Sequence, residues 1–190
     1  LAQLEELCGV PVLGVVPWVT LDIDDEDSVS DRLTVLKSEK AVDIAVIHLP
    51  RISNFTDFTA LSQHPALGVR YVKDPRTLGR PDLVILPGTK NTMADLLWLR
   101  QSGLEGAVKK LAEGGTPILG ICGGYQMLGL TLSDPEGVEQ GGELAGMGLL
   151  PIHTVFDAQK ERTRVTGTVA ALEGLFAPLS GAAFYGYEIH

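Results

Sequence analysis

Several residue types and segments are scarce in this chain of 190 residues. Its two cysteines, Cys8 and Cys122, lie far apart and lack metal-ligand spacing, so neither a disulfide framework nor a zinc site is indicated. No basic cluster offsets the formal net charge of −9, which argues against nucleic acid or an anionic membrane as a partner. No apolar run is long enough to span a bilayer, and the first residues do not show a signal-peptide pattern. These features favour a protein of the reducing cytoplasm.

The apolar content is sufficient for one packed α/β domain, since 45% of the residues are hydrophobic and the mean hydropathy is +0.17. Short apolar runs predict buried strands at residues 42–48, 67–72, 83–86 and 117–121. Helical spacing lies between and beside them at residues 56–62, 91–100 and 104–113. This alternation predicts a mostly parallel sheet that helices cover on both faces. After Gly129, β-prone pieces such as residues 164–170 and 184–190 predict antiparallel strands at the sheet edge.

The first forty residues have a different character. Residues 1–7 predict the end of a helix that stops at Gly9, and residues 12–16 predict a buried strand. The acidic stretch that follows has no compact ligand spacing, which favours a solvated linker over a metal site.

The segment 116–129 is the most informative part of the chain. It places Cys122 between an apolar strand and a short helix, with glycines on both sides, which is the layout of a nucleophile elbow. The first N–H groups of that helix would stabilise a thiolate and a developing oxyanion. The alternative is that Cys122 is a small buried apolar residue, because similar turns occur in nucleotide-binding folds without a nucleophile.

A second loop is expected beside this cysteine. Ligands of parallel sheets bind beyond the carboxyl ends of the strands. Both Gly88 and Cys122 follow such ends, so the sequence predicts that they share one site.

Residues Gly120-Ile-Cys-Gly-Gly-Tyr-Gln126 match the G-x-C-x-G-x-Q signature of class I glutamine amidotransferases, and the run that begins at Cys122 is similar to the cobyric acid synthase branch of that family. Three further segments resemble that branch in the required order: residues 48–58, 86–92 and 186–190. The resemblance implies a flavodoxin-like, three-layer α/β sandwich of the class I glutamine amidotransferase type, with antiparallel strands at the edges of a mostly parallel sheet.

The resemblance also implies roles for individual residues. Cys122 would attack the side-chain amide of glutamine, and backbone N–H groups of Gly88 and Gly123 would bind the resulting oxyanion. Gln126 would help to hold glutamine, and no metal is expected. An ordinary turn glycine and a helix-capping amide are the alternatives for Gly88 and Gln126.

The catalytic histidine of the resembled family lies in a later segment that this sequence does not contain. We therefore expect none of the four histidines to be its equivalent: His48, His64, His153 and His190. His64 is expected in an exposed turn and His48 at a strand end, while His153 is expected in a loop. His190 is expected to shape the sheet edge or the acceptor-facing surface, with a substitute base as the alternative.

In the resembled branch, an ATP-dependent ligase domain precedes the glutaminase. This chain contains no G-x-x-x-x-G-K-[ST] phosphate-binding loop. We therefore expect residues 1–17 to be the end of that ligase domain, residues 18–40 a linker, and residues 41–190 a glutamine amidotransferase domain that is incomplete at its C-terminus.

The implied function is hydrolysis of glutamine through a cysteine thioester. The ammonia would serve ATP-dependent amidation of corrinoid side-chain carboxylates in cobalamin biosynthesis, with ATP and Mg in the ligase domain and no cofactor in this chain. We expect little turnover from the chain alone. The alternatives are the glutaminase of a cobyrinic acid a,c-diamide synthase or of a lipid II amidating enzyme, or a glutaminase-like fold that only binds a partner.

Overall fold

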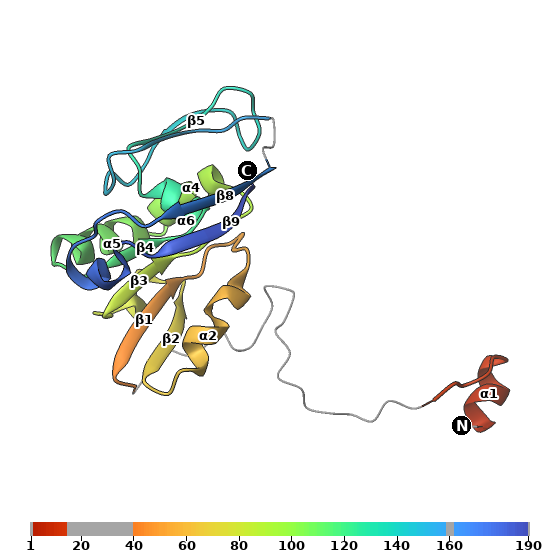
Figure 1. The fold of residues 1–190 in the computed structure, drawn as a ribbon. Helices are drawn as coiled ribbons and strands as arrows, with labels where there is room; N and C mark the ends of the chain where they lie inside the picture. The colour runs from red at the N-terminus through yellow and green to blue at the C-terminus, as the bar shows by residue number, and fades with distance from the viewer. Residues whose placement is uncertain (1, 15–39, 159–161, 190) are drawn as a thin grey trace.

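A four-stranded parallel sheet forms the centre of the structure (Figure 1), a computed structural model that describes residues 2–14, 40–158 and 162–189. Its strand order is β2-β1-β3-β4, with bounds Val42–Ile47 for β1, Leu67–Val72 for β2, Leu83–Leu86 for β3 and Ile118–Gly120 for β4. All neighbouring pairs are parallel. The predicted runs agree with these bounds to within one residue at each end.

The central strand β1 shows why both faces of the sheet are covered. Successive side chains of a strand point to opposite faces. Ala45 and Ile47 belong to one apolar cluster, and Ile44 and Val46 belong to a second. The continuous apolar run of β1 therefore fits a strand that is buried on both sides.

Helices provide the other walls of the two clusters. Leu96 and Leu99 of α4 and Val108 of α5 pack in the first cluster, and Phe58 of η2 packs in the second. The helices after β1 have the bounds Phe55–Phe58 for the 3-10 helix η2, Thr59–Gln63 for α2, Pro75–Leu78 for α3, Thr92–Gln101 for α4, Leu104–Glu113 for α5 and Gly123–Met127 for α6. The helix predicted at residues 56–62 is thus divided between η2 and α2.

The later strands form two small sheets of their own. The first has the order β6-β5-β7, with bounds Thr131–Asp134 for β5, Gly142–Ala145 for β6 and His153–Val155 for β7. The second is an antiparallel ribbon of β8 (Arg162–Thr168) and β9 (Ala183–Ile189), with the 3-10 helix η3 (Gly174–Leu179) between them. The antiparallel strands predicted near residues 164–170 and 184–190 are confirmed by β8 and β9, whereas β7 pairs with β5 in parallel. Among the described residues these strands pair with one another and not with β1–β4, so they form separate sheets rather than extending the edge of the central sheet.

The N-terminal segment contains one helix, α1 (Ala2–Cys8). Gly9 ends it in a left-handed conformation with φ 67°, and its N–H donates to the Glu5 carbonyl at 2.8 Å. The strand predicted at residues 12–16 is wrong in its described part, because residues 12–14 have no regular structure and Leu13 is fully exposed. Residues 12–14 have no neighbouring strand among the residues that the structure describes, so their backbone has no hydrogen-bonded ladder to join there. Residues 15–16 and nearly all of the predicted linker lie outside the described residues.

No helix in the described part of the chain combines the length and apolar character needed to cross a membrane.

Candidate active site

Cys122 stands at a sharp turn between β4 and α6. Its backbone has φ 50° and ψ −115°, and Asn54 is the only other described non-glycine residue with positive φ. Such a conformation costs on the order of 1–3 kcal/mol and is found at functional sites. The cysteine is exposed and free. This thiol is therefore not buried among aliphatic side chains, which was the alternative considered above.

Three glycines allow the tight packing of this elbow. A β-carbon at Gly120 would lie 2.6 Å from the Tyr125 Cα, and one at Gly124 would lie 2.8 Å from the Pro87 carbonyl oxygen. A β-carbon at Gly123 would lie 2.7 Å from the Thr89 methyl group. Since side chains do not fit at these places, Gly120 lets α6 pack on the end of β4, and Gly123 and Gly124 let the start of α6 lie directly against the loop of residues 87–89.

Gly88 lies next to the cysteine, as the sequence predicted. A β-carbon at Gly88 would lie 3.7 Å from the Cys122 Cβ. Gly88 and Gly123 are both buried, and neither N–H group donates to an acceptor in the described part of the chain. Gly123 lacks an intrahelical acceptor because it is the first residue of α6. Two backbone donors beside the thiol are therefore available to a ligand.

Gln126 lies one turn further along α6. Its backbone N–H donates to the Cys122 carbonyl at 3.0 Å, which fixes the turn. Its side-chain oxygen accepts a hydrogen bond from the Thr92 hydroxyl at 3.3 Å, where Thr92 is the first residue of α4. With the oxygen occupied in this way, the Gln126 amide NH₂ keeps its two donors for another partner.

Glu139, which the sequence analysis did not identify, caps α4 from a distant loop. Its carboxylate accepts the N–H groups of Thr92 at 2.9 Å and Met93 at 2.8 Å. These are donors that a helix start leaves without intrahelical partners. A residue 46 or 47 positions away has no local spacing that would reveal such a cap.

Asp134 holds the loop that carries Glu139. Its buried carboxylate accepts four backbone N–H groups at 2.8–3.0 Å, from Val138, Glu139, Gln140 and Gly141. Burial raises the pKa of the Asp134 carboxyl, but the four hydrogen bonds together outweigh this effect and lower the pKa to about 2. Asp134 is therefore ionised at neutral pH and fixes the position of Glu139.

The described histidines lie as follows. His48, at the end of β1, is half-buried with its ring edge-on to Tyr71, and burial lowers its pKa below 6.5. His64 is exposed in a turn, where its Nδ1 accepts the Ala66 N–H at 3.2 Å. Both expectations are confirmed.

His153 begins β7 rather than lying in a loop, because its strand pairs with β5 and its Nδ1 lies 2.7 Å from the Thr131 hydroxyl. His190 lies outside the described residues. Within the described ranges no histidine has a hydrogen bond to Cys122, and no group of three His, Cys, Asp or Glu side chains is arranged to hold a metal ion.

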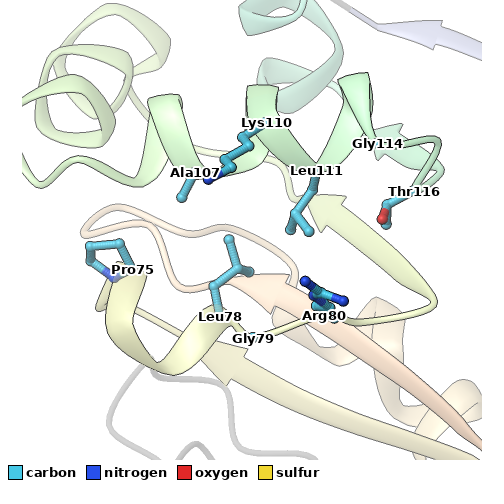
Figure 2. Close-up of a pocket in the computed structure, with 9 residues that line it drawn as sticks. All are labelled: Pro75, Leu78, Gly79, Arg80, Ala107, Lys110, Leu111, Gly114 and Thr116. Atoms are coloured by element: carbon cyan, nitrogen blue, oxygen red, sulfur yellow. The ribbon is translucent and has the colours of Figure 1, made fainter.

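A separate cavity of about 500 Å³ lies between α3 and α5. Figure 2 shows Leu78 and Leu111 pointing toward one another across it, with Arg80 and Thr116 at one end. Arg80 precedes β3 and Thr116 precedes β4, whereas Cys122 follows β4. The cavity therefore lies near the amino ends of the strands, whereas the cysteine lies beyond their carboxyl ends.

A family model described as the CobB/CobQ-like glutamine amidotransferase domain matches residues 43–190. The chain belongs to this family. The matched range includes the central sheet, the elbow and the loop at Gly88.

Several curated members of the family are similar over nearly the whole chain. The cobyric acid synthase of Ruminiclostridium cellulolyticum is 56% identical over 190 residues, which are 100% of this chain and 37% of that protein. The cobyric acid synthases of Lachnoclostridium phytofermentans and Moorella thermoacetica are each 52% identical, over 99% and 98% of this chain. The chain thus spans little more than a third of the length of these relatives.

A solved structure, described as the crystal structure of glutamine amidotransferase, has the same fold. It is 20% identical, with a TM-score of 0.51, and the match covers 77% of this chain and 70% of the other. The expected α/β fold is confirmed by this likeness together with the observed parallel sheet.

Proposed function

We propose that this chain is the glutaminase part of a cobyric acid synthase, with Cys122 as its nucleophile. The observation that carries the proposal is the exposed thiol at a strained elbow, beside the available N–H groups of Gly88 and Gly123. A strained backbone that holds a reactive side chain outward is typical of nucleophile elbows.

The chemistry follows from these groups. The Cys122 thiolate attacks the side-chain amide carbon of glutamine, and the carbonyl oxygen becomes an oxyanion that accepts hydrogen bonds from Gly88 and Gly123. Each such donor contributes about 10²–10³-fold to the rate. Collapse of the intermediate breaks the C–N bond, and the nitrogen takes up a proton and leaves as ammonia. Water then cleaves the thioester to glutamate and restores the thiol.

Gln126 has the role of a substrate-binding residue in this scheme. Its side-chain oxygen is already bonded to Thr92, so its NH₂ group is the part that would donate to glutamine. Ordinary helix-capping remains the competing role, and it would leave the NH₂ group without a function. The proton acceptor for Cys122 is not assigned to any histidine of this chain.

The acceptor of the ammonia would be a corrinoid with free side-chain carboxylates. The names of the relatives support this assignment, because three cobyric acid synthases share more than half of the residues of this chain. ATP and Mg would act in a ligase domain that ends within residues 1–17, followed by a linker over residues 18–40. A cytoplasmic location fits these reactants.

Labelling with 6-diazo-5-oxo-L-norleucine, a diazo-ketone analogue of glutamine, tests the nucleophile. Cys8 is an internal control, because it is also exposed and free. Iodoacetamide should alkylate both cysteines, whereas the diazo-ketone should label Cys122 alone, and L-glutamine but not D-glutamine should protect it. Mass spectrometry of peptides gives the site. A folded protein that takes no label at Cys122 would favour a binding module over a glutaminase.

The acceptor is tested with the intact protein. Glutamine that carries ¹⁵N in its side-chain amide should transfer the label to a corrinoid carboxylate only when ATP and Mg are present. Label that stays in free ammonia under these conditions would contradict the corrinoid assignment and leave the glutaminase assignment intact.

A further inference from the structure

Asp95 of α4 is a fully buried carboxylate with three donors around it. Its Oδ1 accepts the Arg51 Nη1 at 2.9 Å, and its Oδ2 accepts the Arg51 backbone N–H at 3.1 Å and the Thr89 hydroxyl at 2.5 Å. The Asp95 side chain is 0% exposed, whereas that of Arg51 is 50% exposed. Since a buried charge is stable only when it is paired, these contacts form a specific buried hydrogen-bond network rather than a surface ion pair.

The donors belong to two different loops. Arg51 lies in the loop after β1, and Thr89 lies in the loop after β3. The loops also pair directly: Ser53 N–H donates to the Gly88 carbonyl at 2.9 Å, and Lys90 N–H donates to the Arg51 carbonyl at 3.0 Å. Asp95 is therefore the side chain that ties both loops to the same point of α4.

We propose that Asp95 is a positioning residue for the oxyanion donor at Gly88, acting through Thr89 and Arg51. The inference rests on the proposed function, because it concerns the same site. Thr89 follows Gly88 directly, and its methyl group lies against Gly123, where a β-carbon would approach it to 2.7 Å. A shift of Thr89 therefore changes the place of both backbone donors relative to Cys122.

Asparagine at position 95 removes the charge and introduces a defect. An amide has one acceptor oxygen, and its NH₂ group would face either the Arg51 guanidinium or the donors on the other side. In either orientation the NH₂ group would face another hydrogen-bond donor instead of an acceptor. The charge-assisted hydrogen bonds, which are about twice as strong as neutral ones, would be lost. Thr89→Val is a milder change, because it keeps the Asp95 charge and removes one hydroxyl, which donates to Asp95 and also accepts the Asn91 N–H at 3.2 Å. Thr89→Ser keeps that hydroxyl.

Two alkylating agents separate positioning from general damage. The diazo-ketone presents a carbonyl oxygen to the N–H groups of Gly88 and Gly123, whereas iodoacetamide alkylates the thiol without a bound oxyanion. In the intact protein, Asp95→Asn and Thr89→Val should lower the maximal rate of diazo-ketone labelling at Cys122 by about 10–100-fold. The half-saturating concentration and the iodoacetamide rate should stay within about 3-fold. Thr89→Ser keeps the hydroxyl but loses the methyl group beside Gly123, so it should label faster than Thr89→Val and closer to the wild-type rate.

Asp43→Asn is the matched control. Asp43 forms a bidentate ion pair with the nearly buried Arg70. It is the second residue of β1 and so lies near the amino ends of the strands, whereas Cys122 lies beyond their carboxyl ends. This variant should lose stability, yet it should keep the wild-type ratio of the two labelling rates.

The possible outcomes are distinct. Wild-type diazo-ketone rates in both Asp95→Asn and Thr89→Val would overturn the inference alone, as would an equal fall in the iodoacetamide rate. A wild-type protein that takes no diazo-ketone at Cys122 would overturn the proposed function, and this inference with it.

Discussion

Gly124 offers a sharp test of the elbow, because its Cα lies directly against the backbone of residues 86 and 87. In Gly124→Ala, the new methyl group would collide with the Leu86 carbonyl oxygen and would lie 2.5 Å from the Leu86 carbonyl carbon. Carbon atoms pack best at about 3.5–4.0 Å, so the two segments must separate by roughly 1 Å.

That separation acts on bonds that join β3 to the elbow. The Leu86 carbonyl accepts the Ile121 N–H at 2.9 Å, and Leu86 pairs with Gly120 in the β3–β4 ladder. Overpacking costs about 1–3 kcal/mol, and a buried donor left without its acceptor costs a similar amount. We therefore expect Gly124→Ala to lower the free energy of unfolding by about 2–4 kcal/mol. Because Gly88 would move away from Cys122, diazo-ketone labelling should slow by about 10²-fold.

Urea unfolding and the labelling rate measure the two effects. Gly106→Ala is the control, since a β-carbon at Gly106 in α5 would meet no atom within 4 Å. This control should gain about 0.5–1 kcal/mol from helix propensity and should label like the wild type. If Gly124→Ala unfolds at the wild-type urea midpoint and labels at the wild-type rate, the close packing of α6 on residues 86–87 is refuted.

Two further predictions concern strain and charge. Cys122→Gly should lose all labelling at this position and raise the free energy of unfolding by about 1 kcal/mol, because glycine tolerates φ 50°; an unchanged or lower urea midpoint would show that the cysteine is not strained. Asp134 has a folded-state pKa of about 2, below the unfolded value of about 3.9, so its contribution to stability is present above about pH 4 and is lost as the pH falls toward 2. The urea midpoints of wild type and Asp134→Asn should accordingly differ near neutral pH and converge at about pH 2, and a difference that does not change with pH would contradict this.

The sequence was sufficient to predict the bounds of the elements that have a clear apolar pattern. The strands at residues 67–72 and 83–86 have the predicted bounds, because each is a short apolar run between turn residues. The neighbourhood of Gly88 and Cys122 was also predictable, since both follow strands whose carboxyl ends meet at one edge of a parallel sheet.

The supporting contacts were not predictable in the same way. Glu139 reaches Thr92 and Met93, and Asp95 reaches Arg51, over separations of more than forty residues. Such pairs depend on how loops come together after the sheet has formed, and a single sequence contains no spacing that records it. The part of the predicted strand that the structure describes, residues 12–14, failed for a related reason, because its apolar pattern has no neighbouring strand in the described residues.

The supporting contacts nevertheless share one origin, which is the first turn of α4. Thr92 donates its backbone N–H to Glu139 and its hydroxyl to Gln126. Asp95, three residues later, accepts hydrogen bonds from Arg51 and Thr89. The same helix buries Leu96 and Leu99 completely in the main apolar cluster. Because α6 has only five residues and is too short to be stable by itself, the strained turn at Cys122 depends on this rigid neighbour. A cavity beneath α4 should therefore displace the Gly88 and Gln126 sides of the site together.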